Sequence, residues 1–341
     1  ALTGTAIAAS GSTYGAPLNP GAVSFGNVIA GDVVTSTASV NTSTASSSGN
    51  PVVGSYTQTA SALAGTDAGN YSFAGFTTPT QNYTISPAAL TVTSIAGVST
   101  TYGTPAATGA VTLSGVIGSD IVTSAASIVG PTYATSGNLN AGSYAQNASS
   151  LGGADAGNYT LTAFTTPTAN YTVGQLALTG TAIAAAGSTY GSPLTPGAVS
   201  FGNVIAGDVV TSTASVNTGA TSTSGNPVVG SYTQTAGALG GADAGNYSFA
   251  GFTTPTASYT INPLALTGSI TANDKVYDAT AAATIASRGL SGAIGSDRVA
   301  YSGGTATFAD KNAGTAKTVT ATGLGLSGAD AGNYTVNTTA T

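Results

Sequence analysis

Aspartates are the only acidic residues of this 341-residue chain, and six of the 11 recur as three pairs. The pairs are Asp32 and Asp67, Asp120 and Asp155, and Asp208 and Asp243. Paired carboxylates could bind calcium, which prefers about six to eight oxygen ligands, or act as the acid and base of a glycosidase. Each pair offers too few carboxylates for calcium, and repeated copies of one active site argue against an enzyme. We therefore expect no catalytic, cofactor-binding or metal-binding residue, and keep the six aspartates as calcium candidates only under the alternative of a calcium-stiffened protein.

Other side chains that could do chemistry are missing. The chain has no His, Cys, Met or Trp. Without His or Cys it cannot build an ordinary zinc, copper, haem or iron–sulfur site, a Ser–His or Cys–His nucleophile, or a disulfide. We therefore expect a protein that is not an enzyme and that has no cofactor.

Charge is scarce and unevenly placed. Charged residues make up 5% of the chain, and all 5 basic residues lie after residue 274. The lack of a basic surface argues against binding to nucleic acid or to anionic lipid, and no apolar run approaches the ~20 residues that insert into a membrane. Because edge strands without charged residues pair readily with other strands, we expect copies of the chain to associate with one another.

The sequence is a tandem array with a period of 88 residues. Ala-Leu-Thr begins at Ala1, Ala89, Ala177 and Ala265, and Tyr-Gly or Tyr-Asp follows at Tyr14, Tyr102, Tyr190 and Tyr277. The predicted domains are residues 1–88, 89–176, 177–264 and 265–341, named repeats 1 to 4 below, with repeat 4 truncated. Repeats 1 and 3 differ at 14 of 88 aligned positions. Because the chain starts inside this pattern, we expect it to be part of a longer protein.

Each repeat is typical of β structure, because Thr, Val, Ile, Tyr and Phe fill short runs between Gly, Pro, Asn and Ser. In repeat 1 the predicted strands are Leu2–Ala8, Val23–Ile29, Val33–Val40, Ser55–Ala60, Tyr71–Phe76 and Asn82–Ile85, with one helical turn near Ser61–Gly65. We predict an all-β fold, with four small β-sandwich-like domains in tandem and a β-grasp-like arrangement as the alternative. Junctions of two or three residues, often with Pro, predict an extended and stiff rod.

A further motif, Asp-Ala-Gly-Asn-Tyr, begins at Asp67, Asp155, Asp243 and Asp330. We interpret it as a turn in which Asp caps its own backbone, Gly or Asn adopts a positive φ, and Tyr starts the next strand. Two further sets of tyrosines are interpreted as core or strand-pairing residues, with stacking on a polysaccharide as the alternative. They are Tyr56, Tyr144 and Tyr232, and Tyr83, Tyr171 and Tyr259.

The motifs resemble a known group of repeats. Tyr14-Gly15, Tyr102-Gly103 and Tyr190-Gly191, each preceded by Leu-Thr-x-Thr, resemble the MBG (YGX-type) repeats of large bacterial adhesins. Repeat 4, with Lys275-Val-Tyr277-Asp278 and with Ala279 in place of the usual Gly, is similar to the YDG-type repeats of the same proteins. The resemblance implies a filamentous-haemagglutinin-like exoprotein that leaves the cell through an outer-membrane pore by two-partner secretion. It also implies a location at the bacterial surface or in a secreted matrix, in adhesion and biofilm.

These observations favour a non-enzymatic stalk or filament-forming segment of a secreted bacterial adhesin or extracellular matrix protein. Its expected partners are other copies of itself and the secretion pore that the resemblance implies, with a polysaccharide under the alternative function. Two alternatives stay open, a glycan- or surface-binding module and a calcium-stiffened stalk. A regular outward Thr ladder on a flat sheet would favour surface binding, whereas irregular, twisted strands would favour a spacer.

Overall fold

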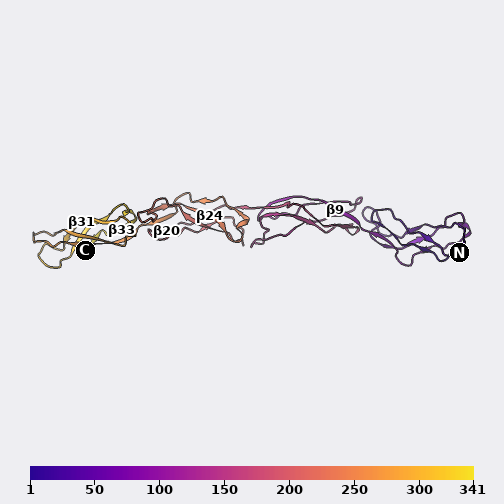
Figure 1. Cartoon of the computed structure of the whole chain (residues 1–341), viewed down its shortest axis with the longest axis horizontal. Coiled ribbons are helices and arrows are strands. Elements are labelled where there is room, and N and C mark those ends of the chain that lie inside the picture. Colours follow the sequence, from indigo (N-terminus) through magenta and orange to yellow (C-terminus); the bar gives the residue numbers. More distant parts are fainter. The chain divides into compact units, whose positions relative to one another are not determined.

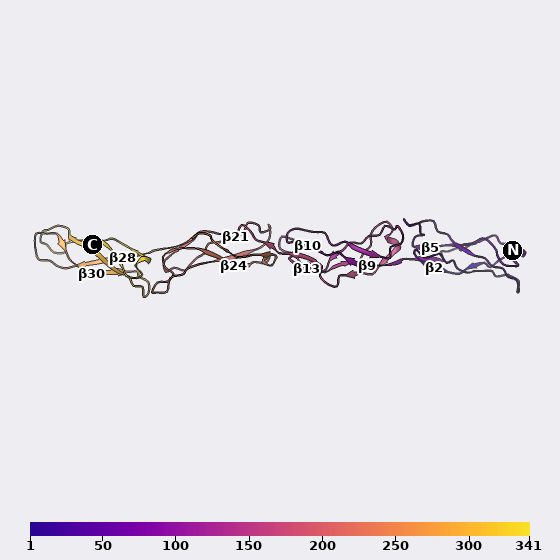
Figure 2. The same cartoon turned by 90° about the horizontal axis from the view of Figure 1, so that it is seen from above.

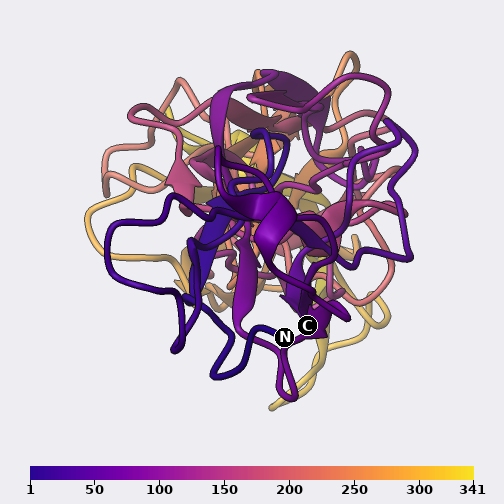
Figure 3. The same ribbon diagram turned by 90° about the vertical axis from the view of Figure 1, so that its right-hand side faces the viewer.

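The fold is all-β, which confirms the prediction for fold class. The structure is a computed structural model that describes residues 1–341, and its strands are two to nine residues long. Short arrows joined by long irregular connections are visible along the whole chain (Figure 1), from above (Figure 2) and from one end (Figure 3). None of its helices is long and apolar enough to cross a bilayer.

The chain divides into two compact units. The first contains Ala1–Tyr133 and Gly137–Gln175, and the second contains Ala134–Ser136 and Leu176–Thr341. Repeats 1 and 2 therefore belong to the first unit, apart from Ala134–Ser136 and Leu176 of repeat 2, and repeats 3 and 4 belong to the second. The division into four domains stays a prediction, and the two units are described separately below.

In the first unit the strands and 3-10 turns follow the two repeats. Repeat 1 contains β1 (Ala6–Ile7), β2 (Ser10–Thr13), β3 (Val23–Ser24), β4 (Ala38–Val40), β5 (Gly54–Tyr56), β6 (Gln58–Ala60), η1 (Ala68–Asn70), β7 (Phe76–Thr77) and β8 (Tyr83–Ser86). Repeat 2 contains β9 (Ala88–Ile95), β10 (Val98–Thr101), β11 (Val111–Ser114), β12 (Ser127–Ile128), β13 (Gly142–Tyr144), β14 (Gln146–Ala148), η2 (Ala156–Asn158), β15 (Tyr159–Leu161), β16 (Phe164–Thr165) and β17 (Tyr171–Gly174).

The second unit repeats this order and then shortens it. Repeat 3 contains β18 (Leu176–Ala177), β19 (Ala182–Ile183), β20 (Ala186–Thr189), β21 (Val199–Ser200), β22 (Thr211–Val216), β23 (Gly230–Tyr232), β24 (Gln234–Gly240), η3 (Ala244–Asn246), β25 (Tyr247–Ser248), β26 (Phe252–Thr253) and β27 (Tyr259–Asn262). Repeat 4 contains β28 (Leu264–Ala272), β29 (Ala282–Ala283), β30 (Ile285–Ser291), β31 (Ala300–Phe308), β32 (Val319–Ser327), η4 (Ala331–Asn333), β33 (Tyr334–Val336) and β34 (Thr339–Ala340).

Most predicted strands of repeat 1 are present in shorter or shifted form, but Tyr71–Phe76 is wrong except at Phe76, where β7 begins. Two further errors concern β2 and the helical turn. Strand β2 was not predicted, because Ser10–Thr13 has no large apolar residue and is held by its pairing with β8. The predicted helical turn near Ser61–Gly65 is wrong, since the turn is η1, three residues further on. It forms on the Asp-Ala-Gly-Asn motif, where small residues allow a tight i to i+3 bond, such as that from the Asn70 N–H to the Asp67 carbonyl.

Repeat 2 shows the arrangement of a complete repeat, which consists of three small sheets. Their strand orders are β11-β9-β15, β12-β14-β16 and β10-β17-β13. The first strand β9 is parallel to β15, and the last strand β17 lies between the parallel β10 and the antiparallel β13. Repeats 1 and 3 build the last sheet in the same way, as β2-β8-β5 and β20-β27-β23.

The largest apolar clusters lie where one repeat meets the next. In the first unit Tyr14, Tyr83 and Ile85 pack with Leu90 and Tyr159 of the following repeat. The equivalent cluster of the second unit is Tyr190, Tyr259, Ile261, Leu266 and Tyr334. A single proline, Pro87 or Pro263, separates the last strand of one repeat from the first strand of the next. Neighbouring repeats in a unit therefore share a core, and the core interpretation of Tyr83, Tyr171 and Tyr259 is confirmed by exposures of 2% or less.

A fully buried glutamine ties each of the first three repeats together. Oε1 of Gln58 accepts a hydrogen bond from the Gly21 N–H at 2.6 Å, and Nε2 donates to the Ala8 carbonyl at 3.1 Å and to Asn82 Oδ1 at 2.9 Å. Gln146 and Gln234 hold the equivalent positions with equivalent bonds. The side chain thereby links the first, middle and last segments of its repeat.

Removal of this glutamine should destabilise the first unit. The Gln58→Ala substitution leaves the partly buried Gly21 N–H and Ala8 carbonyl without their partner, and an unsatisfied group of this kind costs about 1–3 kcal/mol. We expect a loss of about 3 kcal/mol in the free energy of unfolding, measured by urea denaturation. The matched control is the exposed Gln81→Ala, and equal stabilities of the two variants would contradict the structural role of Gln58.

Candidate functional site at the junction between repeats

Asp120 lies at the centre of the junction between repeats 1 and 2. Its Oδ2 accepts hydrogen bonds from the hydroxyl of Tyr14 at 2.5 Å and from that of Tyr159 at 2.6 Å. Its Oδ1 accepts from the backbone N–H of Ser48 at 3.0 Å and from the Ser48 hydroxyl at 2.6 Å. The residue is 9% exposed, so the carboxylate is satisfied almost entirely by donors of both repeats.

The two tyrosines are positioned by the strands on either side of the junction. Tyr14 follows β2, and its N–H donates to the Ser86 carbonyl at the end of β8 at 2.8 Å. Tyr159 is the first residue of β15. The two rings pack edge to face, with centroids 5.2 Å apart and an interplanar angle of 75°. This is a favourable arrangement for aromatic rings, and it brings both hydroxyls to one carboxylate.

The tip of a hairpin in repeat 1 binds the second aspartate of repeat 2. The Ser47 N–H donates to Asp155 Oδ1 at 3.1 Å, and the Ile121 N–H donates to Asp155 Oδ2 at 2.8 Å. Next to it, the Val53 N–H donates to Asn158 Oδ1 at 2.9 Å. The Asp and Asn of the Asp-Ala-Gly-Asn motif therefore bind the preceding repeat.

This finding corrects part of the interpretation of the motif. The motif is a turn, and Tyr159, Tyr247 and Tyr334 begin strands as predicted, although Tyr71 of repeat 1 does not. The predicted self-capping is wrong, since the Asp side chain makes no cap bond to its own turn. The predicted positive φ is also wrong, because neither the Gly nor the Asn of the motif has one. A 3-10 turn satisfies its backbone with ordinary negative φ, which leaves the Asp and Asn side chains available to the neighbour.

The glycine of the Tyr-Gly motif is required by close approach across the junction. Gly15 has φ +79°, and a Cβ built on it would lie 2.2 Å from Cδ1 of Ile117 in repeat 2. Gly191 in the second unit has φ +80°, and its Cβ would lie 2.0 Å from Cδ1 of Ile294. Any larger residue would strain the backbone at this positive φ and would force the end of the facing Ile side chain to move.

The junction between repeats 3 and 4 has the same chemistry. Oδ2 of Asp297 accepts from the hydroxyls of Tyr190 and Tyr334, both at 2.5 Å, and Oδ1 accepts from the Ser224 N–H at 2.9 Å. Asp330 accepts from the Thr223 N–H at 3.2 Å and from the Thr223 hydroxyl at 2.7 Å. Two separate units therefore contain the same arrangement around a carboxylate, which is buried at Asp120 and partly buried at Asp297.

The remaining aspartates of the three pairs are also hydrogen-bond acceptors. Asp32 accepts from the Tyr71 hydroxyl at 2.7 Å, and Asp67 accepts from the Val33 N–H at 2.8 Å. In the second unit Asp243 accepts from the Thr135 N–H at 3.0 Å and from the Val209 N–H at 2.7 Å, and Asp208 accepts from the Tyr247 hydroxyl at 2.5 Å. The fold brings together no group of three or more His, Cys, Asp or Glu side chains. Calcium binding stays a hypothesis.

The junction shifts the ionisation of its own groups in opposite directions. Burial alone would raise the pKa of Asp120, but the hydrogen bonds from Ser48, Tyr14 and Tyr159 outweigh it and hold this pKa well below its usual range. Asp297 behaves in the same way, with bonds from Ser224, Tyr190 and Tyr334. Burial and the adjacent carboxylate raise the pKa of the tyrosine hydroxyls. The junction therefore favours ionised aspartates and neutral tyrosines.

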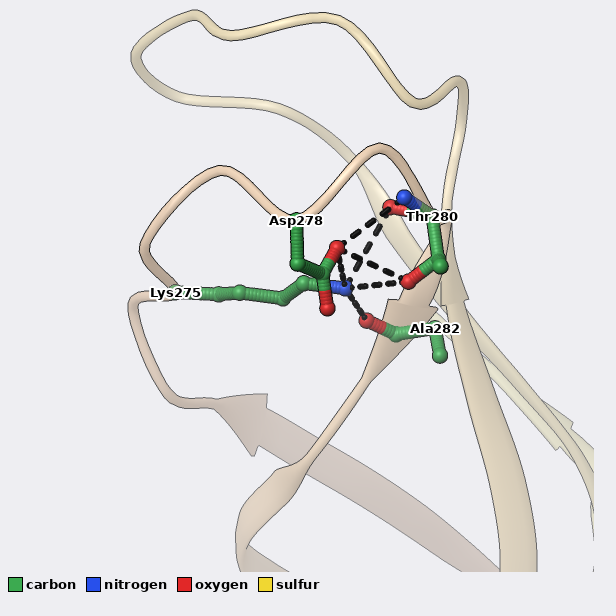
Figure 4. Close-up of polar contacts among 4 residues, drawn as sticks. All are labelled: Lys275, Asp278, Thr280 and Ala282. Atoms are coloured by element: carbon green, nitrogen blue, oxygen red, sulfur yellow. Dashed lines mark hydrogen bonds and ion pairs between the residues drawn. The ribbon is translucent and has the colours of Figure 1, made fainter.

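A separate polar cluster shapes the Tyr-Asp loop of repeat 4 (Figure 4). Nζ of Lys275 pairs with Asp278 Oδ1 at 2.7 Å and donates to the Thr280 hydroxyl at 2.7 Å and the Ala282 carbonyl at 2.8 Å. The pairing with Lys275 lowers the pKa of Asp278 to about 2. Ala279, which stands in place of the usual Gly, has φ +62°, a conformation that Gly adopts without strain. The three donors of the lysine are used inside the loop, so this cluster fixes loop shape.

Sequence reasoning identified the aspartates of the junction but not their donors. The hairpin tips share the tripeptide Ser-Gly-Asn, which begins at Ser48, Ser136 and Ser224 and recurs with the 88-residue period. That recurrence was the available signal. The role of this tripeptide cannot be read from one repeat alone, because Ser48 binds Asp120, which lies 72 residues later in the next repeat.

Comparison with known proteins identifies one part of the chain. Residues 262–341 match the YDG domain family, which confirms the YDG-type prediction for repeat 4. Searches of curated proteins and of solved structures give no match.

The opposite pKa shifts predict that stability is constant at intermediate pH and falls on both sides, in an acid limb and an alkaline limb. The pKa of Asp120 is below its unfolded value near 3.9, so its stabilisation is complete above about pH 4 and is lost as the pH falls further. The pKa of Tyr159 is above its unfolded value near 10, so its stabilisation is complete below about pH 10 and is lost as the pH rises. The melting temperature, followed by circular dichroism, should therefore be nearly constant from about pH 5 to 9.

A variant isolates the acid limb of this profile. The double substitution Asp120→Asn and Asp297→Asn should lower stability at pH 7 by about 2–4 kcal/mol and flatten the fall below pH 4. The exposed Asp274→Asn is the control and should keep both the plateau and the limb. An unchanged acid limb in the double variant would show that the junction carboxylates do not carry it.

Proposed function

We propose that this chain is a non-enzymatic stalk segment of a secreted bacterial surface adhesin or extracellular matrix protein. The observation that carries the proposal is the junction, where Asp120 is bound at once by Tyr14 of one repeat and Tyr159 of the next. A buried carboxylate with directional bonds from both sides opposes bending, because any rotation between the repeats breaks several of these bonds together. A stalk requires this property, whereas an enzyme does not.

The adhesin context comes from the resemblance of repeats 1 to 3 to MBG repeats and from the YDG match of repeat 4. In this proposal the protein reaches the bacterial surface by two-partner secretion, and the repeats separate its functional parts. Calcium is unnecessary for stiffening in this proposal, because Tyr and Ser donors satisfy the junction carboxylate.

Surface binding by threonines is the weaker alternative. An exposed cluster on the β4-β6-β7 sheet contains Asn41, Thr59 and Thr77, but these side chains bond to one another at 2.8–2.9 Å. The strands of this sheet are only two or three residues long. No long flat ladder of free hydroxyls is formed there, so the geometry favours a spacer.

Stiffness of the junction can be measured directly, because the chain has no native Cys. Spin labels on Ser39→Cys in β4 and Ser127→Cys in β12 report the distance between repeats 1 and 2. We expect a narrow distance distribution by pulsed electron paramagnetic resonance, and a distribution about twofold or more broader after Asp120→Ala.

The matched control for this experiment is Asp32→Ala. Asp32 holds the position of Asp120 in repeat 1, but it accepts its hydrogen bond from the hydroxyl of Tyr71 in the same repeat. The control should leave the distribution narrow. A broad distribution in the unsubstituted chain would overturn the stalk proposal.

The proposal also includes association between copies of the chain. Residues 1–274 contain no Lys or Arg, so the edges of their small sheets lack the positive charges that normally keep strands apart. Sedimentation velocity and electron microscopy at low and high concentration should show filaments or lateral bundles that grow with concentration. A chain that stays monomeric at millimolar concentration would count against this part of the proposal.

A further inference from the structure

In each of repeats 1 to 3, a strand near the start of the repeat lies beside its last strand and runs in the same direction. The pairs are β2 with β8, β10 with β17 and β20 with β27, and each is parallel over four residues. In a parallel pair, the N-terminal end of one strand and the C-terminal end of the other lie at opposite ends of the ladder. The chain therefore enters the ladder at one end and leaves it at the other.

This geometry determines how a repeat responds to tension along the chain. In repeat 2, a pull on the chain before β10 and after β17 slides the two strands past each other along their length. The ladder bonds run between the strands, so this pull loads them together and they must break in one step. Antiparallel strands in these places would bring the two pulled ends together, and the same tension would then open the bonds one at a time. Strand β9, which precedes β10, is also parallel to its neighbour β15.

The tyrosine of the Tyr-Gly motif closes the C-terminal end of this ladder. The Tyr102 N–H donates to the Gly174 carbonyl at 2.8 Å. The same bond occurs in repeats 1 and 3, from Tyr14 to Ser86 and from Tyr190 to Asn262, again at 2.8 Å. All three tyrosines are 1–2% exposed, and their burial keeps water from replacing these bonds.

The buried glutamine fastens the other end of the ladder. Nε2 of Gln146 donates to the carbonyl of Ala96, which lies between β9 and β10, at 3.0 Å. It also donates to Oδ1 of Asn170, which directly precedes β17, at 2.9 Å. The Val98 N–H donates to the Asn170 carbonyl at 2.9 Å. Because β13 pairs with the opposite side of β17, the last strand is held from both sides and at both ends.

We infer that each of repeats 1 to 3 is a shear clamp, a parallel ladder that resists tension along the chain because its bonds are loaded in one step. This property differs from the stiffness of the junctions, which opposes bending between repeats. The use of the clamp under load at a cell surface rests on the stalk proposal, whereas the clamp itself is a property of a single repeat.

The direction of loading can be tested with optical tweezers, because force can be applied between two introduced cysteines of the otherwise Cys-free full chain. The shear pair is Ala96→Cys with Gly174→Cys, at the start of β10 and the end of β17. The matched peel pair is Thr101→Cys with Gly174→Cys, which are register partners, so a pull between them opens the ladder from one end. All three positions are exposed, and the two pairs release nearly the same length of chain.

We expect the rupture force of the shear pair to exceed that of the peel pair about twofold or more at the same loading rate. Urea denaturation should give the two double variants the same stability, because neither substitution removes a bond of the ladder. When the unsubstituted chain is pulled through handles fused to its two ends, repeats 1 to 3 should rupture at forces close to that of the shear pair.

Equal rupture forces in the two geometries would overturn the inference, as would rupture of the end-pulled repeats at the force of the peel pair. The spin-label experiment reports bending at a junction, whereas this experiment reports tension within repeat 2. A narrow distance distribution with equal rupture forces would therefore contradict the clamp alone, and a broad distribution with unequal forces would contradict the stalk alone.

Discussion

The structure depends on burying a carboxylate in a part of the chain that offers no cation. Residues 1–274 contain neither Lys nor Arg, so Asp120 can be held only by neutral donors. A buried charge without partners would cost several kcal/mol, and the hydroxyls of Tyr14 and Tyr159 and the two donors of Ser48 must therefore be in place together. Because these donors come from both repeats, the stable form of one repeat is completed by its neighbour.

This constraint explains why the motifs recur together, and it makes each junction asymmetric, because the preceding and the following repeat contribute different motifs. Each complete junction takes a Tyr-Gly and a hairpin tip from the preceding repeat, and an Asp and an Asp-Ala-Gly-Asn turn from the following one. Gly15 belongs to the motif because Ile117 of the next repeat occupies the space of a side chain. The contact is kept when the residue at the tip changes, since the N–H of Ser47 donates to Asp155 and the N–H of Thr223 donates to Asp330.

The sequence predicted the period because whole motifs recur along the chain. It predicted the all-β class and the buried tyrosines because these follow from composition and alternation within a short window. The contacts of the junction could not be predicted from such a window, since Tyr14 and Asp120 are 106 residues apart. Asp155 was interpreted as a local cap because short-range turn chemistry is the commonest use of Asp, and the distant hairpin tip took its place. The parallel pairing of β10 with β17 was also hidden, because alternation shows which face of a strand is buried and not which strand lies beside it.

The junctions around Asp120 and Asp297 have nearly the same chemistry, which raises the question of what keeps neighbouring repeats in order. The bonds around Asp120 and Asp297 are close to interchangeable, so they cannot by themselves select one partner over another. The single proline between successive strands can, because a one-residue connection gives the adjacent repeat a far higher effective concentration than any other copy. Correct order is then a consequence of covalent proximity.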